Sequence, residues 1–240
     1  MSVTTRIQEL NNRLATNLVS KGVSAEGTET TTELINKVND IESGGTSVIN
    51  PEWTDWQYFS YNNNRNDLVA KLKYSDTANG TNFSYMFGNC SKLTTIPQFD
   101  TSKGTNFNSM FQNCSKLTSV PQLDTSNGTN FSYMFYSCRA LTSISLLNMS
   151  NVSGTNWSSM FYNCPALKNV TFEGTIPVRG NMSVFSSCPN LTVESLMSFI
   201  NALTNMSDTA TYTITIGSTN LAKLTEEQIQ IATDKRITLQ

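Results

Sequence analysis

The chain has 240 residues, a formal net charge of −2 and 38 % hydrophobic side chains, so its length suits one domain with appended segments. Near-neutral charge argues against electrostatic binding of nucleic acid or of an anionic membrane, and the apolar runs are too short for insertion across a bilayer. Met1 leads into a polar segment rather than a basic and then an apolar one, so we expect no secretory signal peptide and a virion or extracellular location.

Residues 1–43 are predicted to form two amphipathic helices, because apolar side chains recur at helical spacing in each half. Gly44 and Gly45 end this segment, and residues 44–52 are predicted to be a linker. A hairpin of this size buries too little apolar surface to be stable alone. We interpret it as a module for attachment to other virion or surface proteins or for homo-oligomerisation, a trimer being suited to a fibre. The alternative is an N-terminal solubilising cap.

A repeat of about 24 residues follows. Its most regular marks are cysteines separated by 24, 24, 26 and 24 residues: Cys90, Cys114, Cys138, Cys164 and Cys188. The surrounding sequence repeats too, since TNFSYMFGNC at 81–90 becomes TNFNSMFQNC at 105–114. Such a period is typical of stacked repeat proteins, which usually present a long binding surface. We therefore expect a solenoid over residues 53–192, with aromatic residues at 53–59 covering its first turn.

Each repeat unit divides into two halves. The first carries apolar residues at i, i+3, i+4 and i+7, which predicts a short helix or helical turn with one apolar face. In the first full unit these residues are Phe83, Met86, Phe87 and Cys90. The second half, such as 93–99, is predicted to be extended and buried on one side. A polar segment then turns the chain, with glycine expected for positive φ at Gly80, Gly104, Gly128 and Gly154.

The cysteines are expected to be reduced and buried. An odd number of cysteines at equivalent positions of a stack does not suggest a disulfide framework, and small thiols pack well in a ladder. The sequence has no CxxC motif and no histidine, so we expect no zinc site. One phenylalanine and one cysteine of each unit form the predicted repeat core: Phe87, Cys90, Phe111, Cys114, Phe135, Cys138, Phe161, Cys164, Phe185 and Cys188.

From Met86 onward the chain follows the pattern MFxxCxxLxxIPxxDTSxxT, which resembles the BspA-like class of leucine-rich repeats found in surface antigens and in phage and gut-bacterial proteins. The resemblance covers residues 66–192. It implies an α/β repeat fold, a right-handed leucine-rich-repeat solenoid with a parallel sheet on one side, that recognises surfaces rather than catalysing a reaction. The N-terminal segment LATNLVSKGVSAEGTETTTELINKVNDI is similar to N-terminal segments of phage tail-associated proteins.

Residues 193–240 depart from the repeat and are predicted to form a small α/β cap. The pattern predicts a helix near Leu196, a strand over 212–216 and a last short strand over 237–239. Thr225-Glu-Glu-Gln228 has the form of a capping box that opens another helix. Such a cap would cover the apolar end of the stack.

Catalytic chemistry is not indicated. The absence of histidine removes the usual general base and the commonest metal ligand, and no phosphate-binding loop or nucleophile elbow occurs. We therefore expect no enzyme activity and no cofactor. One acidic residue per turn, at Asp76, Asp100 and Asp124, leaves a calcium site as an alternative to a turn-capping role.

The positions that vary between repeat units are candidates for a recognition surface. Tyrosine, serine and asparagine combine adaptable hydrogen bonding with flat apolar area, which suits a neutral glycan or a protein epitope. The candidate recognition residues are Tyr85, Gln112, Tyr133, Tyr136 and Tyr162. The alternative is a solvated face that binds nothing.

Three functions are compatible with these features. The first is a phage tail or fibre component that binds a bacterial cell-surface glycan or protein through the solenoid. The second is a bacterial surface or secreted adhesin of the BspA-like kind, which would need an export signal or an anchor. The third is a scaffold without an external ligand.

Overall fold

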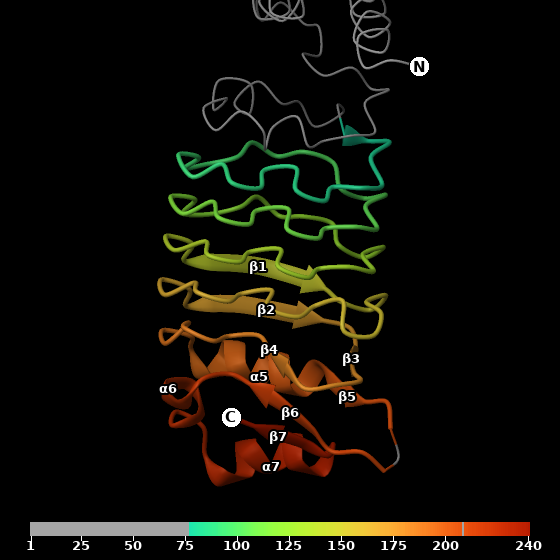
Figure 1. The fold of residues 1–240 in the computed structure, drawn as a ribbon, viewed down its shortest axis with the longest axis vertical. Coiled ribbons are helices and arrows are strands. Elements are labelled where there is room, and N and C mark those ends of the chain that lie inside the picture. Colours follow the sequence, from blue (N-terminus) through green and yellow to red (C-terminus); the bar gives the residue numbers. More distant parts are fainter. Residues whose placement is uncertain (1–76, 208) are drawn as a thin grey trace, which may run out of the picture. The chain divides into compact units, whose positions relative to one another are not determined.

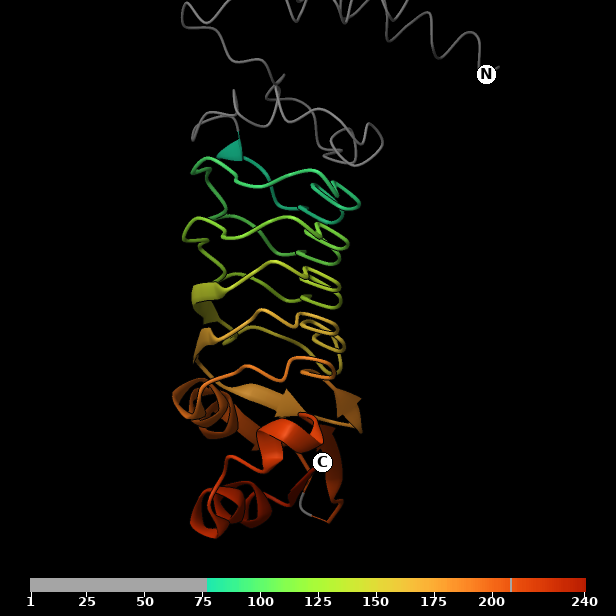
Figure 2. The same ribbon diagram turned by 90° about the vertical axis from the view of Figure 1, so that its left-hand side faces the viewer.

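The computed structural model describes residues 77–207 and 209–240, which form a column of stacked coils that ends in helices and short strands (Figures 1 and 2). The predictions for residues 1–43, 44–52 and 53–59 lie outside these residues. Among the residues described, no helix is long and apolar enough to cross a membrane. The regular elements are β1 (Ser143–Asn148), β2 (Asn169–Glu173), β3 (Ile176–Val178), β4 (Met182–Ser183), α5 (Val193–Ala202), β5 (Leu203–Asn205), β6 (Tyr212–Thr215), α6 (Ser218–Leu221), α7 (Glu226–Asp234) and β7 (Ile237–Leu239).

The first half of each described unit is a series of tight turns, so the predicted helix or helical turn is wrong. At positions 86, 88 and 90 the backbone N–H donates to the carbonyl oxygen three residues earlier, at 2.9–3.2 Å. At positions 83, 85, 87 and 89 it donates to the next coil, at 2.7–3.0 Å. Beyond its first turn an α-helix bonds successive N–H groups to its own carbonyl oxygens, whereas here every second N–H is left to join the coils. The apolar side chains point inward in both cases, so their spacing does not separate the two structures.

The second half of a unit is extended, but it becomes a regular strand only near the C-terminal end of the stack. β1 and β2 pair in parallel and bury apolar side chains on one side. In the two preceding units, Pro97 and Pro121 stand where β1 has Ser145. Proline has no N–H to donate to a ladder. The extended segment of the coil before β1 is therefore joined to β1 by an isolated bridge between Ser119 and Ser143.

Columns of aromatic rings fill the stack. The rings of one column stack with centroids 5.3–5.5 Å apart and interplanar angles of 4–17°; they are Phe87, Phe111, Phe135, Phe161 and Phe185. A second column contains Phe83, Phe107 and Phe131, and the buried Trp157 holds the equivalent position in the next unit. Each coil is therefore bound to the next by ring stacking inside and by backbone hydrogen bonds outside.

The recurrent glycines have a different cause from the one predicted. Gly154 has a φ of +55°, but Gly80, Gly104 and Gly128 do not have positive φ. A Cβ atom built on Gly128 would lie 2.1 Å from the ring of Phe131, and Gly80 and Gly104 face the equivalent rings in their own units. These three glycines are needed because the ring three residues later lies directly against the backbone.

Helix α5 covers the outer edge of β2. The Oγ atoms of Ser195 and Ser198 accept hydrogen bonds from the N–H groups of Val170 and Phe172, at 3.0 and 2.9 Å. Buried backbone donors at a sheet edge need such partners. The serine hydroxyls of the helix therefore accept the hydrogen bonds that a neighbouring strand would otherwise accept.

Two further parallel sheets complete the C-terminal part. β3 pairs with β5, and β4, β6 and β7 form a three-stranded sheet with β6 in the middle. Helix α7 opens with the predicted capping box, in which the Thr225 hydroxyl accepts from the Gln228 N–H and the Gln228 side chain accepts from the Thr225 N–H. The Lys235 side chain donates to the Ile200 and Asn201 carbonyl oxygens and so caps the end of α5.

Candidate functional site

The candidate recognition residues project from the tight turns. Tyr85, Ser109, Tyr133 and Ser159 occupy equivalent positions one coil apart, and all have positive φ, between 52° and 58°. This left-handed conformation favours glycine and asparagine and is unfavourable for a bulky residue. The second positive-φ position of the turns carries asparagine or serine, as at Asn89. Tyrosine at 85 and 133 is therefore not explained by the needs of the backbone.

Three of the tyrosines come together and are called here the tyrosine cluster: Tyr133, Tyr136 and Tyr162. The rings of Tyr136 and Tyr162 stack with centroids 5.1 Å apart and an interplanar angle of 11°. The ring of Tyr133 lies 5.8 Å from that of Tyr136 at a tilt of 59°. Tyr133 and Tyr162 are 41 % and 37 % exposed, and Tyr136 is half-buried between them. The cluster thus offers flat apolar area with hydroxyl groups at its rim.

The other two candidate residues lie outside the cluster. Tyr85 is 39 % exposed and its ring lies over Gly88, where an added Cβ atom would approach it to 3.1 Å. Between Tyr85 and Tyr133 in the same column, Ser109 is buried. Gln112 is half-buried one coil before Tyr136. The candidate residues belong to two columns of equivalent positions, and the structure brings Tyr133 of one column together with Tyr136 and Tyr162 of the other.

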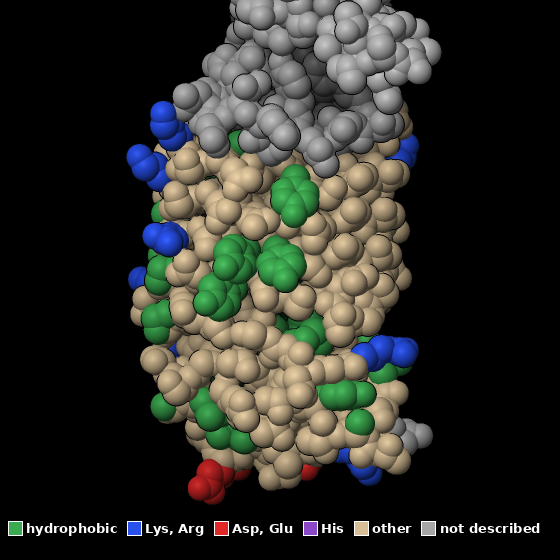
Figure 3. Space-filling view, viewed as in Figure 1, with side chains coloured by type: hydrophobic (Ala, Val, Ile, Leu, Met, Phe, Trp, Pro, Cys, Tyr) green, Lys and Arg blue, Asp and Glu red, His purple; other side chains and the backbone are tan. Residues whose placement is uncertain are grey.

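The flank of this surface is tied from coil to coil by side chains. The Nδ2 atom of Asn113 donates to the Oδ1 atom of Asn89 at 2.9 Å, and the Nδ2 atom of Asn163 donates to the Ser137 hydroxyl at 3.1 Å. In Figure 3, hydrophobic side chains gather in the middle of this face among neutral polar atoms, whereas Lys and Arg side chains lie mainly near its edges and Asp and Glu at its lower end. The surface is therefore aromatic, joined from coil to coil by side-chain hydrogen bonds, and poor in charge.

The acidic residues of the repeat cap turns. The Oδ1 atom of Asp100 accepts a hydrogen bond from the Ser102 N–H at 2.9 Å, and that of Asp124 accepts from the Ser126 N–H at 3.0 Å. Within residues 77–207 and 209–240, no group of three or more His, Cys, Asp or Glu could hold a metal ion. Asp76 lies outside the described residues. The geometry at Asp100 and Asp124 agrees with the turn-capping alternative.

The cysteines lie in the core as buried free thiols of low reactivity. The Sγ atoms of Cys114, Cys138, Cys164 and Cys188 each donate to the carbonyl oxygen of a core phenylalanine in the preceding coil, at 2.7–3.0 Å. Burial raises the pKa of Cys90 to about 11 and that of Cys138 to about 12, and it also raises the pKa values of Cys114 and Cys164. Since the thiolate is the reactive form, these thiols serve packing.

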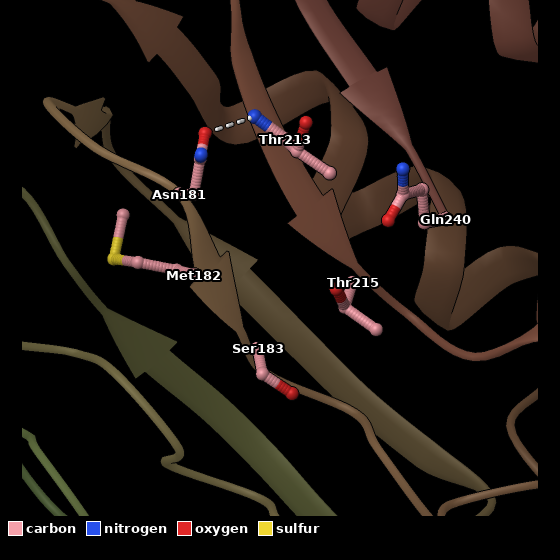
Figure 4. A pocket seen from close by; sticks show the side chains of 6 residues that line it. All are labelled: Asn181, Met182, Ser183, Thr213, Thr215 and Gln240. Carbon is pink, nitrogen blue, oxygen red and sulfur yellow. Dashed lines mark hydrogen bonds between the residues drawn. The ribbon is translucent and has the colours of Figure 1, made fainter.

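A second surface feature was not predicted from the sequence. An open depression of about 480 Å³ lies over β4 and β6, lined by Asn181, Met182, Ser183, Thr213, Thr215 and Gln240 (Figure 4). Parallel pairing of β4 with β6 places Met182 opposite Ile214 and so joins segments about 32 residues apart in the chain. The alternation Tyr-Thr-Ile-Thr-Ile at 212–216 was the available signal, since it places Thr213 and Thr215 on one face.

Two protein families match parts of the chain. Residues 132–230 match "BspA type Leucine rich repeat region (6 copies)", and residues 55–173 match "Mycoplasma protein of unknown function, DUF285". Each match covers less than half of the chain, and both include part of the stack of coils. Together they support a BspA-like leucine-rich repeat protein. No curated protein and no solved structure matches the chain significantly.

Proposed function

We propose that this chain is a non-enzymatic recognition protein that binds a bacterial cell-surface glycan or protein, and that it acts as a component of a phage tail or fibre. The tyrosine cluster carries the proposal. Its stacked, partly exposed rings form an aromatic surface on a face that is poor in charge. Tyrosine presents a large contact area with few rotatable bonds, which suits binding surfaces.

The backbone of the turns supports the same conclusion. Tyr85 and Tyr133 hold a conformation that costs a non-glycine residue about 1–2 kcal/mol. Unfavourable conformations that the rest of the fold tolerates are common at functional sites. Asparagine, which tolerates this conformation better, occupies the second positive-φ position of the turn at Asn89, whereas positions 85 and 133 carry tyrosine.

The test is binding to cells. Fluorescently labelled full chain is incubated with a panel of bacteria and bound protein is counted by flow cytometry. The double variant Tyr133→Ala with Tyr136→Ala should lose at least about tenfold in affinity, as expected for an aromatic hot spot. Its melting temperature should change little, because the cluster lies on the surface.

Met206→Ala is the control. It removes a large hydrophobic side chain that is 52 % exposed and makes no ring contact to the tyrosine cluster. It should therefore bind like the unaltered chain. If the double variant also binds as before, the tyrosine cluster is not the recognition surface.

Attachment through the N-terminal segment is tested separately. Light scattering gives the solution mass of the full chain and of a chain that begins at Pro51. An oligomer that becomes a monomer without residues 1–50 supports an assembly role for this segment, as a tail or fibre component requires. Two monomers contradict that role and leave docking on another protein, or a cap, for residues 1–50.

A second candidate is a bacterial surface or secreted adhesin. The match of residues 132–230 to BspA-type repeats favours it, since the resemblance of these repeats to surface antigens does not depend on a virion. Both candidates use the same recognition surface. They differ in what residues 1–50 bind, so the light-scattering result also bears on this choice.

A further inference from the structure

We propose that the depression over β4 and β6 is a second subsite of the recognition surface, and that the ligand spanning both is a neutral oligosaccharide. This inference rests on the proposed function and narrows its ligand from a glycan or protein to a carbohydrate without charge. The tyrosine cluster would stack on the sugar rings, and the depression would bind the sugar hydroxyl groups.

The depression continues the face that carries the tyrosine cluster. Ser183 follows Ser159 in the column that also contains Tyr133, one coil further along. The Ser159 N–H donates to the Ser183 carbonyl oxygen at 2.9 Å, and the Val184 N–H donates to the Thr215 carbonyl oxygen at 3.1 Å. The ladder that joins the coils therefore runs on into the sheet beneath the depression, where Figure 1 places β4 and β6 below the coils.

Most side-chain polar groups of the depression are available to a ligand, except the Ser183 hydroxyl, which forms a hydrogen bond with the Ser186 hydroxyl. Asn181 accepts a hydrogen bond from the Thr213 N–H through its Oδ1 atom, at 2.8 Å, which fixes the amide and leaves its Nδ2 group to donate elsewhere (Figure 4). The side chains of Thr213, Thr215 and Gln240 make no hydrogen bond to the residues that the structure describes. Ile214 is fully buried, so the two threonines on either side of it share the opposite face of β6.

The chemistry of this lining matches a sugar. Hydroxyl and amide groups both donate and accept hydrogen bonds, as sugar hydroxyls require, and no charged side chain lines the depression. An anionic ligand would lose hydration there without gaining an opposite charge. By contrast, the depression beside β5 is lined in part by Asp234, Lys235 and Arg236. The neutral depression includes Ser183, which continues the column of Tyr133 and Ser159.

The repeat spacing also suits an extended oligosaccharide. Stacked core rings of successive coils have centroids 5.3–5.5 Å apart, a distance comparable to the length of one sugar residue. Tyr133, Tyr162 and Ser183 belong to three consecutive coils. A short linear oligosaccharide along the stack can therefore place one residue near each coil, with rings on tyrosine and hydroxyls on the threonines.

The experiment uses the full chain on an array of neutral and acidic bacterial oligosaccharides of at least about four residues. We expect neutral members to be bound. Affinity for the best neutral member is then measured by calorimetry for Thr213→Val with Thr215→Val, which removes two hydroxyls while keeping shape and strand preference. Affinity should fall about tenfold, with an unchanged melting temperature. The matched control is Thr204→Val, at the charged depression beside β5, which should bind normally.

The outcomes separate this inference from the proposed function. Undiminished affinity of the double valine variant overturns the subsite while leaving the tyrosine cluster in place. Binding to acidic members alone overturns the assignment of a neutral ligand and leaves a charged glycan. Binding to cells but to no oligosaccharide overturns the carbohydrate assignment and leaves recognition of a protein. Binding to neither cells nor oligosaccharides overturns the inference and the proposed function together.

Discussion

The Sγ atom of Cys164 lies 2.9 Å from the carbonyl oxygen of Phe135 in the preceding coil and donates a hydrogen bond to it. A carbonyl oxygen has two lone pairs, and in the equivalent place Phe111 O accepts both the Cys114 N–H of its own coil and the Cys138 thiol of the next. Alanine in place of the cysteine would lack the hydrogen bond from the thiol to the carbonyl oxygen. A larger apolar residue would not fit beside the stacked rings. The repeated cysteine is thus a small donor that links coils inside an apolar core.

Stability should fall in alkaline solution because of these thiols. The pKa of Cys138 is about 12 in the folded chain, against an ordinary value of 9.0. Below pH 9 the thiol is protonated in both states and its contribution is fully present. Between pH 9 and the folded pKa the unfolded chain releases a proton that the folded chain keeps, so the free energy of unfolding falls by about 1.4 kcal/mol per pH unit for each such thiol.

Urea unfolding between about pH 8 and about pH 11 measures this slope. Cys138→Ala should have a shallower dependence on pH than the unaltered chain, because one thiol no longer titrates in the unfolded state. Lysine and tyrosine titration is common to both proteins and cancels in the comparison. Identical slopes would show that the Cys138 thiol does not resist ionisation on folding.

Phe111→Ala should lower the free energy of unfolding by about 3–5 kcal/mol, because it opens a cavity in the middle of a stacked column. The ring is fully buried and stacks on Phe87 and Phe135 on either side. Lys116→Ala, at an exposed position of the same unit, is the control and should change stability by less than about 0.5 kcal/mol. An unchanged melting temperature in Phe111→Ala would refute the inward orientation of this residue.

Two glycine variants distinguish crowding from backbone strain. Gly128→Ala should destabilise by about 1–3 kcal/mol or more, because its Cβ atom would overlap the ring of Phe131. Gly154→Ala has open space around the added atom but keeps a φ of +55°, so its cost should be nearer 1 kcal/mol. Chemical unfolding of both variants gives the order, and a larger loss in Gly154→Ala would contradict the explanation from crowding.

Ser109→Ala should leave stability unchanged or raise it by up to about 1 kcal/mol. Ser109 is 1 % exposed and its hydroxyl has no hydrogen-bond partner among residues 77–207 and 209–240. A buried hydroxyl without a partner is unfavourable, so its removal costs nothing in lost bonds. Ser159→Ala, half-buried in the same column, is the control. A clear loss of stability in Ser109→Ala would reveal a partner for the hydroxyl, such as a bound water.

Some features of the fold can be predicted from the sequence because they depend on position within the repeat. Phe111 and Cys114 have identical residues at the equivalent positions of the other units. Their inward orientation therefore follows from the repeat and from their apolar side chains. The tight turns could not be predicted, because the inward residues of this turn series have the same spacing as one face of a helix. The tight turns differ from a helix in having positive φ at residues such as Tyr85, and this conformation cannot be predicted from the residue type.

The two parts of the candidate site differ in the same way. The equivalence of Tyr85 with Tyr133 and of Tyr136 with Tyr162 follows from the repeat, although the stacking of Tyr136 on Tyr162 depends on side-chain geometry. The neutral depression could not be predicted, because Asn181 and Thr213 meet only through the parallel register between β4, in the last repeat unit, and β6, which lies beyond it. A repeat pattern determines what lies within the stack and gives no information about how the chain pairs after it.

The serine pairing on β2 limits how copies of this protein can associate. A sheet edge with unpaired N–H groups can accept a strand from another molecule and so begin a fibre of joined sheets. Here the Val170 and Phe172 donors are already bound by Ser195 and Ser198. Copies of the chain therefore cannot join end to end by extending the β1–β2 sheet through this edge, and any ordered assembly must use other surfaces of the chain.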